Sequence, residues 1–373
     1  MKQILVINAG SSTIKWKVVD PGTGDSTHGG TIDDLRGSQD YLSAFQVLLN
    51  SLPEAIELSA VGHRVVHGGE QFVSPEVITD SLEEAIEALI PLAPLHNPEN
   101  LAGIRATRAA LPHLKHVAVF DTAFHHTLPE AASTLAIPRD LAGQWGLRKY
   151  GFHGTSHSFV SRAASEMLGG ERTSHRIISL HLGNGSSAAA IKGGVCIETS
   201  MGFTPLQGLV MGTRSGDLDP SVVGFLNRNA GLTIAEVDAL LNTESGLLGL
   251  AGTSDFRELS ALATSGDSDA LLALDVWGWR VRHYLGAYAA LMGGLDAVVF
   301  TGGIGENSAE ARMRATEGLA FLGIELDGDR NAQSSSEARI ISPEGSPVTL
   351  LVIPTNEEWE IARETLQAIS SPR

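Results

Sequence analysis

The sequence is poor in cysteine and has no long apolar run. Cys196 is the single cysteine of the 373-residue chain, so no internal disulfide can form. A cysteine without a partner is more often a small packed side chain than a nucleophile. No run of about 18 or more uncharged apolar residues occurs, which argues against a transmembrane helix. The opening MKQILVINAG has an apolar run too short for a secretion signal. These absences predict a cytoplasmic protein that does not associate with a membrane.

Basic residues are also scarce. The chain has 26 Lys and Arg residues against 43 Asp and Glu residues, a formal net charge of −17 at pH 7. Nucleic-acid surfaces need a concentrated excess of positive charge, so no nucleic-acid partner is expected. The same negative field repels any anionic substrate. Such a substrate must therefore be held by a local cluster of basic side chains, backbone amides or metal.

An internal echo is the strongest organising feature of the sequence. ILVINAGSSTIK at residues 4–15 and IISLHLGNGSSAAAIK at 177–192 each read as an apolar run, a Gly-Ser-Ser turn and a second run. This pattern predicts two similar hairpins whose glycines allow close backbone approach and whose serines can reach phosphate oxygens. Gly and Ser punctuate many hairpins, so either copy alone is weak support for phosphate binding. The duplication, in a chain of 43% hydrophobic residues, favours two related domains.

Four further apolar runs are followed directly by polar residues. They begin at residues 60, 116, 295 and 348. Helical patterns lie between them: we expect a helix capped by Ser81, one with a Thr233–Glu236 capping box, and a long buried helix over 267–292 that places Trp277 and Trp279 in the core. Alternation of strands and helices predicts an α/β fold, with ligands at the carboxyl ends of the strands.

Several charged and polar residues at these strand ends suit phosphoryl transfer to a carboxylate. The transition state of that reaction needs positive charge around the phosphorus, which Arg64 and Arg214 can supply, although most arginines are surface or salt-bridged residues. His153 lies between glycines and can donate to a phosphoryl oxygen, although a lone histidine is more often structural. Among the carboxylates, Asp121 ends a buried run and can orient a metal-bound water or a ligand.

Magnesium prefers a few hard oxygen ligands, with water completing its shell. Asn8 follows the first apolar run and Glu357 lies in PTNEE, so both residues fit that chemistry. The histidine spacings do not support a zinc site. We therefore predict a magnesium site built from Asn8 and Glu357.

Long segments of the chain resemble the signature segments of one family. They are NAGSSTIK, HRVVHGGE, FDTAFH, YGFHGTSH, HLGNGSS, SMGFTPLQGLVMGTRSGDLDP, FTGGIGENS and PTNEE. In this order they resemble the acetate kinases, the acetokinase family of carboxylate phosphotransferases, from residue 4 to beyond residue 360. The resemblance implies a duplicated ribonuclease-H-like fold of the actin, heat-shock cognate and sugar kinase superfamily, with an interdomain cleft. The domains would be 1–125 plus 359–373 and 126–358, and the protein would be a homodimer.

The resemblance also implies roles at the reacting end of the substrates. Arg64 would hold the carboxylate and phosphoryl group, Asp121 would be the essential catalytic acid, and His153 with Arg214 would stabilise the transition state. Asn8 and Glu357 would bind Mg²⁺, with Mn²⁺ able to substitute. The acyl group of acetate or acetyl phosphate would lie among Val66, Leu95, His96, Phe152 and Pro205.

The nucleotide, ATP or ADP, would lie along four segments. Lys15 would contact the ATP phosphates, next to Ser11 and Ser12. The remaining residues implied for the nucleotide are His181, Leu182, Gly183, Asn184, Gly185, Asp255, Phe256, Arg257, Gly302, Gly303, Ile304, Gly305, Glu306 and Asn307. Small departures from the family pattern, such as Thr13, Trp16 and Glu198, touch none of the groups assigned to catalysis.

Two other functions remain open from the sequence. A propionate kinase differs by one methylene of pocket volume, and Val66 favours the smaller acid. An actin-like or chaperone-like ATPase can share the same fold, because fold does not fix function. The set of Arg64, Arg214, His153 and Asp121 argues against an ATPase, which needs no carboxylate clamp.

Overall fold

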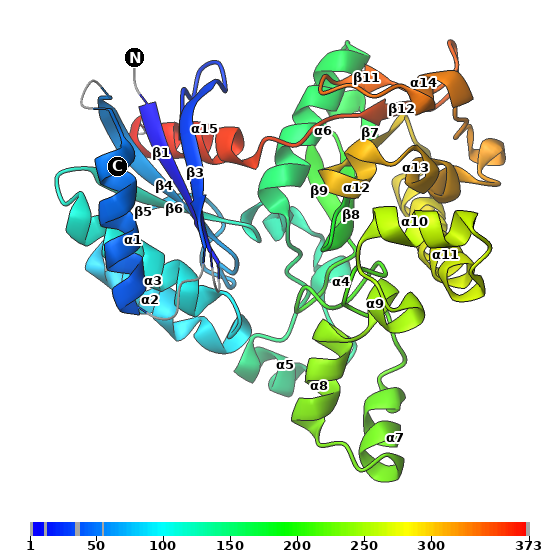
Figure 1. Cartoon of the computed structure of the whole chain (residues 1–373), viewed down its shortest axis with the longest axis horizontal. Coiled ribbons are helices and arrows are strands. Elements are labelled where there is room, and N and C mark those ends of the chain that lie inside the picture. The colour runs from blue at the N-terminus through cyan, green and yellow to red at the C-terminus, as the bar shows by residue number, and fades with distance from the viewer. Residues whose placement is uncertain (1–2, 11–12, 34–37, 54–55, 371–373) are drawn as a thin grey trace. The chain divides into compact units, whose positions relative to one another are not determined.

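The computed structural model describes residues 3–10, 13–33, 38–53 and 56–370. The chain forms two compact units (Figure 1). The first unit comprises Met1–His126, Phe152–Phe159 and Asn356–Arg373, and the second comprises Thr127–Gly151 and Val160–Thr355. The first unit therefore includes a short segment, Phe152–Phe159, from the middle of the chain. The sequence-based domain boundaries after residues 125 and 358 stay a prediction.

Each unit contains a six-stranded mixed sheet. The first sheet has the order β3-β2-β1-β4-β6-β5, and the second has the order β11-β12-β10-β7-β8-β9. The strands of the first are β1 (Gln3–Ala9), β2 (Ile14–Val19), β3 (Ser26–Ile32), β4 (Leu58–Val65), β5 (Glu76–Val77) and β6 (Lys115–Phe120). Those of the second are β7 (Arg176–Leu182), β8 (Ser186–Lys192), β9 (Val195–Thr199), β10 (Ala297–Thr301), β11 (Arg339–Ile340) and β12 (Thr349–Val352).

The two sheets have the same topology. Adding six to each strand number of the first sheet gives the order 9-8-7-10-12-11. This is the order of the second sheet when that sheet is read from its β9 edge. The hairpins β1–β2 and β7–β8 are antiparallel. In the middle of the sheets, β4 pairs in parallel with β1 and β6, and β10 pairs in parallel with β7 and β12. The internal echo of the sequence is thus a duplication of structure, and the predicted α/β class is confirmed.

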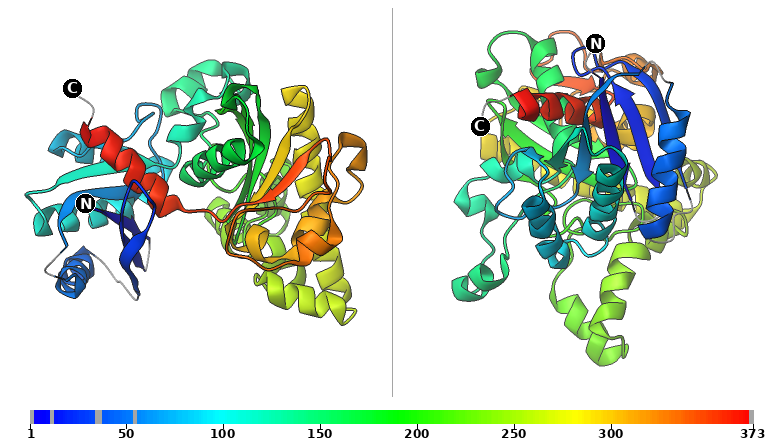
Figure 2. Two further views of the ribbon diagram at one scale, coloured as in Figure 1. Left: turned by 90° about the horizontal axis from the view of Figure 1, so that it is seen from above. Right: turned by 90° about the vertical axis from the view of Figure 1, so that its left-hand side faces the viewer.

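Helices cover both faces of the first sheet. They are α1 (Ser38–Ser51), α2 (Asp80–Ala88), α3 (Asn97–Ala110) and α15 (Glu357–Ser370). Leu5 and Ile7 of β1 pack in one cluster with α1, whereas Ile4 and Val6 pack with α15 on the opposite face (Figure 2). A strand buried on both faces needs a continuous apolar run, which explains the sequence ILVI.

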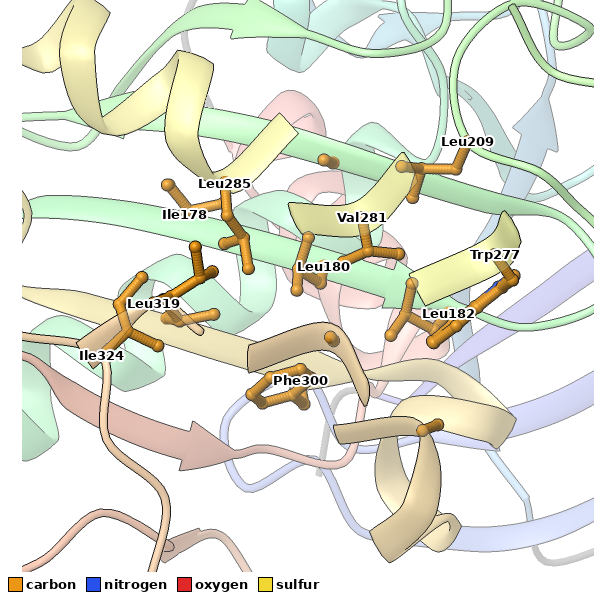
Figure 3. Packing of buried hydrophobic residues seen from close by; sticks show 14 of the residues in the cluster. Ile178, Leu180, Leu182, Leu209, Trp277, Val281, Leu285, Phe300, Leu319 and Ile324 are labelled. Carbon is orange, nitrogen blue, oxygen red and sulfur yellow. The ribbon is translucent and has the colours of Figure 1, made fainter. Parts of the chain in front are cut away.

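The second unit contains the other helices. They are α4 (Glu130–Ser133), α5 (Arg139–Trp145), α7 (Ser221–Asn229), α8 (Ile234–Thr243), α9 (Gly246–Ala251), α10 (Phe256–Thr264), α11 (Ser268–Met292), α12 (Gly302–Asn307), α13 (Ala309–Thr316) and α14 (Gly328–Ala332). Helix α6 (Gly154–Leu168) starts in the first unit and ends in the second. In the core, Ile178, Leu180 and Leu182 of β7 meet Trp277, Val281 and Leu285 of α11 (Figure 3).

Two local predictions are wrong. Trp277 is fully buried, but Trp279 is 71% exposed, because residues two apart on a helix point about 200° apart. Helix α2 is capped by the side chain of Thr79, which accepts from the Leu82 amide, and not by Ser81. The capping box of Thr233 and Glu236 on α8 is confirmed. Cys196 is buried, and its burial raises the pKa of the thiol, as a packed cysteine requires.

Among the helices that the structure describes, none combines the length and the apolar character needed to cross a membrane.

Candidate active site

A buried ion pair joins two neighbouring strand ends of the first unit. Arg64 lies on β4, and Asp121 directly follows the parallel strand β6. The Arg64 Nε atom donates to both Asp121 carboxylate oxygens at 3.1 Å, and Nη2 donates to Oδ2 at 2.6 Å. Asp121 is 1% exposed, and its amide donates to the Val65 carbonyl at 2.9 Å, which extends the strand pairing by one step. The geometry fixes the guanidinium plane through a short, charge-assisted pair.

Charge is unbalanced around this pair. Burial raises the pKa of the Asp121 carboxyl, and this effect outweighs the lowering by Arg64. Burial by itself lowers the pKa of Arg64, but the carboxylates of Asp121, Glu357 and Glu358 reverse this and raise it. Three carboxylates thus act electrostatically on one guanidinium, and one of them, Glu358, also pairs with Lys17 at 3.3 Å. The carboxylates in this cluster outnumber its basic side chains, so a further positive charge bound here would be stabilised.

Asn8 and Lys15 lie next to this pair on the β1–β2 hairpin. The Arg64 Nη1 atom donates to Asn8 Oδ1 at 3.3 Å. Asn8 and Lys15 are directly opposite each other in the antiparallel register, so their side chains lie on the same face of the sheet. The Lys15 side chain is exposed. Ser11 and Ser12, which were predicted to contact phosphate, lie outside the described residues.

Glu357 is the first residue of α15 and is tied to the segment Phe152–Phe159. Thr155 Oγ1 donates to Glu357 Oε2 at 3.0 Å, and Ser158 Oγ donates to Glu360 Oε1 at 2.7 Å. Glu357 acts electrostatically on both Arg64 and Asp121, which places the predicted metal ligand at the same cluster.

His153 has an unusual backbone conformation. Its φ of +57° is the single positive value among the non-glycine residues that the structure describes. The next amide, of Gly154, donates to the Asp121 carbonyl at 3.0 Å, and a Cβ atom at Gly154 would overlap that carbonyl. A left-handed histidine costs about 1 to 3 kcal/mol and is typical of functional sites. The strained turn holds His153 one residue from a backbone contact with Asp121.

The predicted acyl-binding residues of the first unit differ in burial. Val66 and Phe152 are buried, Phe152 packs edge-on against His67, and the His125 ring Nε2 donates to the Phe152 carbonyl at 2.9 Å. Leu95 is 61% exposed, and His96 is partly buried immediately before α3. Val66 and Phe152 are therefore fixed apolar side chains.

Arg214 and Pro205 lie together in the second unit. Arg214 Nη1 donates to the Pro205 carbonyl at 3.4 Å and contacts the Met211 sulfur at 3.9 Å. Neither partner is acidic, and burial lowers the pKa of Arg214. Unlike Arg64, this guanidinium is held without neutralising its charge.

The second unit also contains a pocket of about 760 Å³. Residues predicted to bind the nucleotide account for most of its wall: Gly183, Asn184, Asp255, Phe256, Arg257, Gly303, Ile304 and Asn307. They come from the β7–β8 turn, the start of α10 and helix α12. The structure thus brings together three segments that are about 70 and 50 residues apart in the chain.

The other nucleotide-binding residues predicted in the second unit do not line this pocket, but they lie in β7, the β7–β8 turn and α12, next to residues that do. Leu182 is a core side chain, and His181 lies on β7 opposite Thr301 of β10. Gly302 has a φ of +77°, and a Cβ atom there would lie 2.8 Å from the Leu182 carbonyl. Glu306 Oε1 accepts from the amides of Gly302 and Thr355. Gly185 and Gly305 complete the turn and helix α12.

Sequence reasoning missed Ser254, Ser260, Ser308, Ala309 and Glu310, which also line the pocket. Their nearness in sequence to Asp255 and Asn307 was the available signal.

The oxygen donors of the first unit suit a magnesium ion. Asn8 supplies an amide oxygen, and Glu357 supplies a carboxylate beside a cluster with excess negative charge. Such hard oxygens are the ligands that Mg²⁺ selects.

Comparisons with known proteins identify the family of the chain. The model of the acetokinase family matches residues 32–363. The chain is 52% identical to an acetate kinase of Leifsonia xyli, and the match covers 100% of both chains. An acetate kinase of Clavibacter michiganensis is 51% identical over 99% of both chains.

Two crystal structures have closely similar folds. The acetate kinase of Porphyromonas gingivalis has a TM-score of 0.94 and 40% identity, covering 99% of this chain and 100% of that one. A propionate kinase of Francisella tularensis has a TM-score of 0.89 and 41% identity, covering 98% and 99%. The sequence match and the fold thus agree, and the chain belongs to the acetokinase family.

Proposed function

We propose that the protein is a magnesium-dependent acetate kinase. It transfers the γ-phosphoryl group of ATP reversibly to acetate, giving acetyl phosphate and ADP. An acetate oxygen forms a bond to the γ-phosphorus while the bond from that phosphorus to the bridging oxygen breaks, and ADP leaves with the electron pair. The observation that carries the proposal is Arg64, a guanidinium clamped by Asp121 two residues before the apolar Val66.

In this proposal Arg64 binds the carboxylate of acetate and a phosphoryl oxygen. Asp121 is fully buried and has three hydrogen bonds from Arg64, so its carboxylate fixes the guanidinium before substrate arrives. Val66 and Phe152 contact the methyl group, with Leu95, His96 and Pro205 completing the acyl site. An apolar wall beside a cation selects a short-chain carboxylate.

His153 and Arg214 stabilise the transition state. Loose phosphoryl-transfer transition states spread charge over the equatorial oxygens, and fixed donors stabilise that charge best. His153 is held by a strained turn. Among the described residues, the Arg214 guanidinium has a carbonyl and a thioether as its hydrogen-bond partners and no carboxylate, so its charge remains available for an anion.

Asn8 and Glu357 would hold Mg²⁺. When bound, the ion neutralises charge on the phosphate oxygens. Lys15, on the same face as Asn8, binds the ATP phosphates, together with Ser11 and Ser12. In the second unit, the pocket formed by Gly183, Asn184, Phe256, Ile304 and Asn307 binds the adenosine end of the nucleotide.

The direct test is ATP consumption by the purified protein with magnesium and either acetate, propionate, butyrate or no acceptor. Hydroxylamine traps any acyl phosphate as a hydroxamate. The expected result is hydroxamate formation, fastest per molar substrate with acetate. Hydrolysis of ATP without trapped product would instead support the actin-like or chaperone-like ATPase.

Propionate kinase is the second candidate, favoured by the 41% identity to the Francisella propionate kinase. One methylene changes binding by about 1 to 3 kcal/mol, so both acids should react. Replacement Val66→Ala enlarges the acyl site and should raise the ratio of propionate to acetate turnover. A wild-type kcat/KM that is higher for propionate would favour the second candidate.

We also propose a homodimer located in the cytoplasm. Sedimentation velocity of the purified protein tests the first point, since a single monomer species would contradict it. Fractionation of the source cells tests the second.

A further inference from the structure

The side chain of Asn100 connects the two strand ends that carry the proposed site. The parallel pairing of β1 with β4 ends at Ile7 and His63. Beyond this point, Asn100 of α3 bridges the two strands. Its Nδ2 donates to the Ala9 carbonyl at 2.7 Å, and its Oδ1 accepts from the Val66 amide at 2.9 Å.

The hydrogen-bonded bridge of Asn100 is buried and closely packed. Asn100 is 4% exposed, and its partners lie 91 and 34 residues away in the chain. Helix α3 lies so close to β1 that a Cβ atom at Gly103 would be 2.7 Å from the Ala9 Cβ. A buried polar group with both partners satisfied fixes its neighbours, because losing either bond leaves an unpaired backbone group.

Neighbouring bonds hold the same segment after β4. Asn97 Oδ1 accepts from the His67 amide at 3.2 Å, and Asn97 Nδ2 donates to the His67 carbonyl at 3.1 Å. Thr122 Oγ1 accepts from the Gly68 amide at 3.0 Å. These bonds secure the segment 66–68 to α3 and to the residue after Asp121, but only Asn100 also reaches β1.

We propose that Asn100 is a positioning residue, which sets the separation between Asn8 on β1 and Val66 after β4. This inference rests on the proposed function, in which Asn8 binds the metal and Val66 contacts the acyl group. Ala9 directly follows Asn8, so a shift of the Ala9 carbonyl moves the metal ligand. A shift of the Val66 amide moves the acyl wall and, two residues earlier, Arg64.

The bridge requires a carboxamide, because one end donates and the other accepts. The substitution Asn100→Asp keeps the acceptor for Val66 but places a carboxylate oxygen against the Ala9 carbonyl. Asn100→Leu has a similar size and provides neither bond. A misplacement of about 1 Å at reacting groups can cost about a hundredfold in rate.

The experiment measures kcat and KM for acetate and propionate with the full-length protein, together with Mg²⁺ dependence. For Asn100→Asp the expected result is a loss of about tenfold or more in kcat/KM for acetate, with a changed acetate-to-propionate ratio. Protonation restores a donor toward Ala9, so activity relative to wild type should recover as the pH is lowered from about 8 to about 6. ADP affinity without Mg²⁺ should stay within about twofold.

The matched control is Thr107→Val on the same helix. Thr107 is 1% exposed, and its hydroxyl donates only within α3 and to no strand end, to the Gly103 carbonyl at 2.7 Å. This variant also loses a buried hydrogen bond, yet its substrate ratio and pH profile should match those of the wild type.

Folding is checked first by thermal unfolding. If Asn100→Asp does not fold, Asn100→Ser gives the same kinetic readouts, since a hydroxyl is too short to span both strands. A folded variant with an unchanged acetate-to-propionate ratio and an unchanged Mg²⁺ dependence would overturn the inference, as would a loss no larger than that of Thr107→Val. Failure of the wild type to form acetyl phosphate would instead refute the proposed function.

Discussion

The two units share a sheet topology but bury different kinds of side chain. Among the residues that the structure describes, the apolar core of the first unit forms three clusters around β1, β4 and β6. Between them it buries titratable and amide groups: His63, His67, Asn97, Asn100, His116, Asp121, His125 and Glu360. The second unit has a large apolar cluster organised by α11, and most of its buried polar residues are serines and threonines.

This difference indicates how the two copies of a duplicated fold can take different functions. In the first unit, buried charges and amides fix polar groups at strand ends, which suits acid, cation and metal chemistry. In the second, a rigid apolar core supports glycine-rich turns around a pocket of about 760 Å³, which suits binding of a nucleotide. The topology is common to both, and the buried residue types distinguish them.

The largest expected effect is on kcat/KM, and it should differ between an ion pair of the first unit and one of the second. Arg64→Ala removes the cation proposed to bind substrate and leaves Asp121 buried without its partner, so kcat/KM for acetate should fall about a thousandfold or more. Arg176 and Asp296 form the matched pair in the second unit, at 2.7 Å with both side chains half-exposed. Arg176→Ala should change kcat/KM less than about threefold. Steady-state kinetics measure kcat/KM of both variants. Equal losses of kcat/KM would contradict different functions for the two units.

The next comparison concerns His153 and Arg214, the two residues proposed to stabilise the transition state. His153→Ala and Arg214→Ala should each lower kcat by about a hundredfold or more while leaving ATP binding largely intact. His153→Gly should lower kcat as much as His153→Ala. Its free energy of unfolding should be about 1 kcal/mol higher than that of His153→Ala, because glycine adopts a positive φ without strain. Urea unfolding and single-turnover kinetics measure the two effects separately. Near-normal kcat in any of these variants would refute the assigned role.

Acid should destabilise the first unit through its buried histidines. Burial lowers the pKa of His67 from 6.5 to about 4, and burial also lowers the pKa values of His63 and His116. Below about pH 6.5 the unfolded chain binds more protons than the folded chain, so the free energy of unfolding falls as the pH falls toward 4. For His67 the full effect is about 3 kcal/mol.

Urea unfolding at a series of pH values measures this dependence. His67→Asn keeps an acceptor for the Gly69 amide, which now donates to His67 Nδ1 at 3.0 Å, but it cannot titrate. Its stability should therefore fall less steeply with acid than that of the wild type. A slope identical to that of the wild type would show that His67 does not contribute.

Helix caps give the smallest expected difference. Thr79 of the first unit makes one capping bond to the Leu82 amide, whereas Thr233 of the second forms a reciprocal capping box with Glu236. Thr79→Ala and Thr233→Ala should each cost about 1 kcal/mol, with the larger loss at Thr233. Thermal unfolding of the two variants ranks them.

Sequence by itself predicted the duplication, most of the candidate site residues and the strands that are apolar runs. It did not predict β3, β5, β9 and β11, which are short or largely exposed. Apolar runs such as ILVI need no partner to be identified, because burial on both faces requires an unbroken run. The Thr233–Glu236 capping box is local in sequence, so it was predicted correctly. Trp279 was predicted wrongly, because its hydrophobicity gave no information on which side of α11 it lies.

Only the tertiary structure decided which side chains meet. Arg64 and Asp121 were each predicted as functional residues, but their pairing joins positions 57 residues apart. Asn100 was not predicted at all, since its partners are Ala9 and Val66, and an asparagine near a helix start looks like an ordinary capping residue. Hydrogen bonds between distant segments depend on how strands and helices pack, and no local pattern encodes that packing.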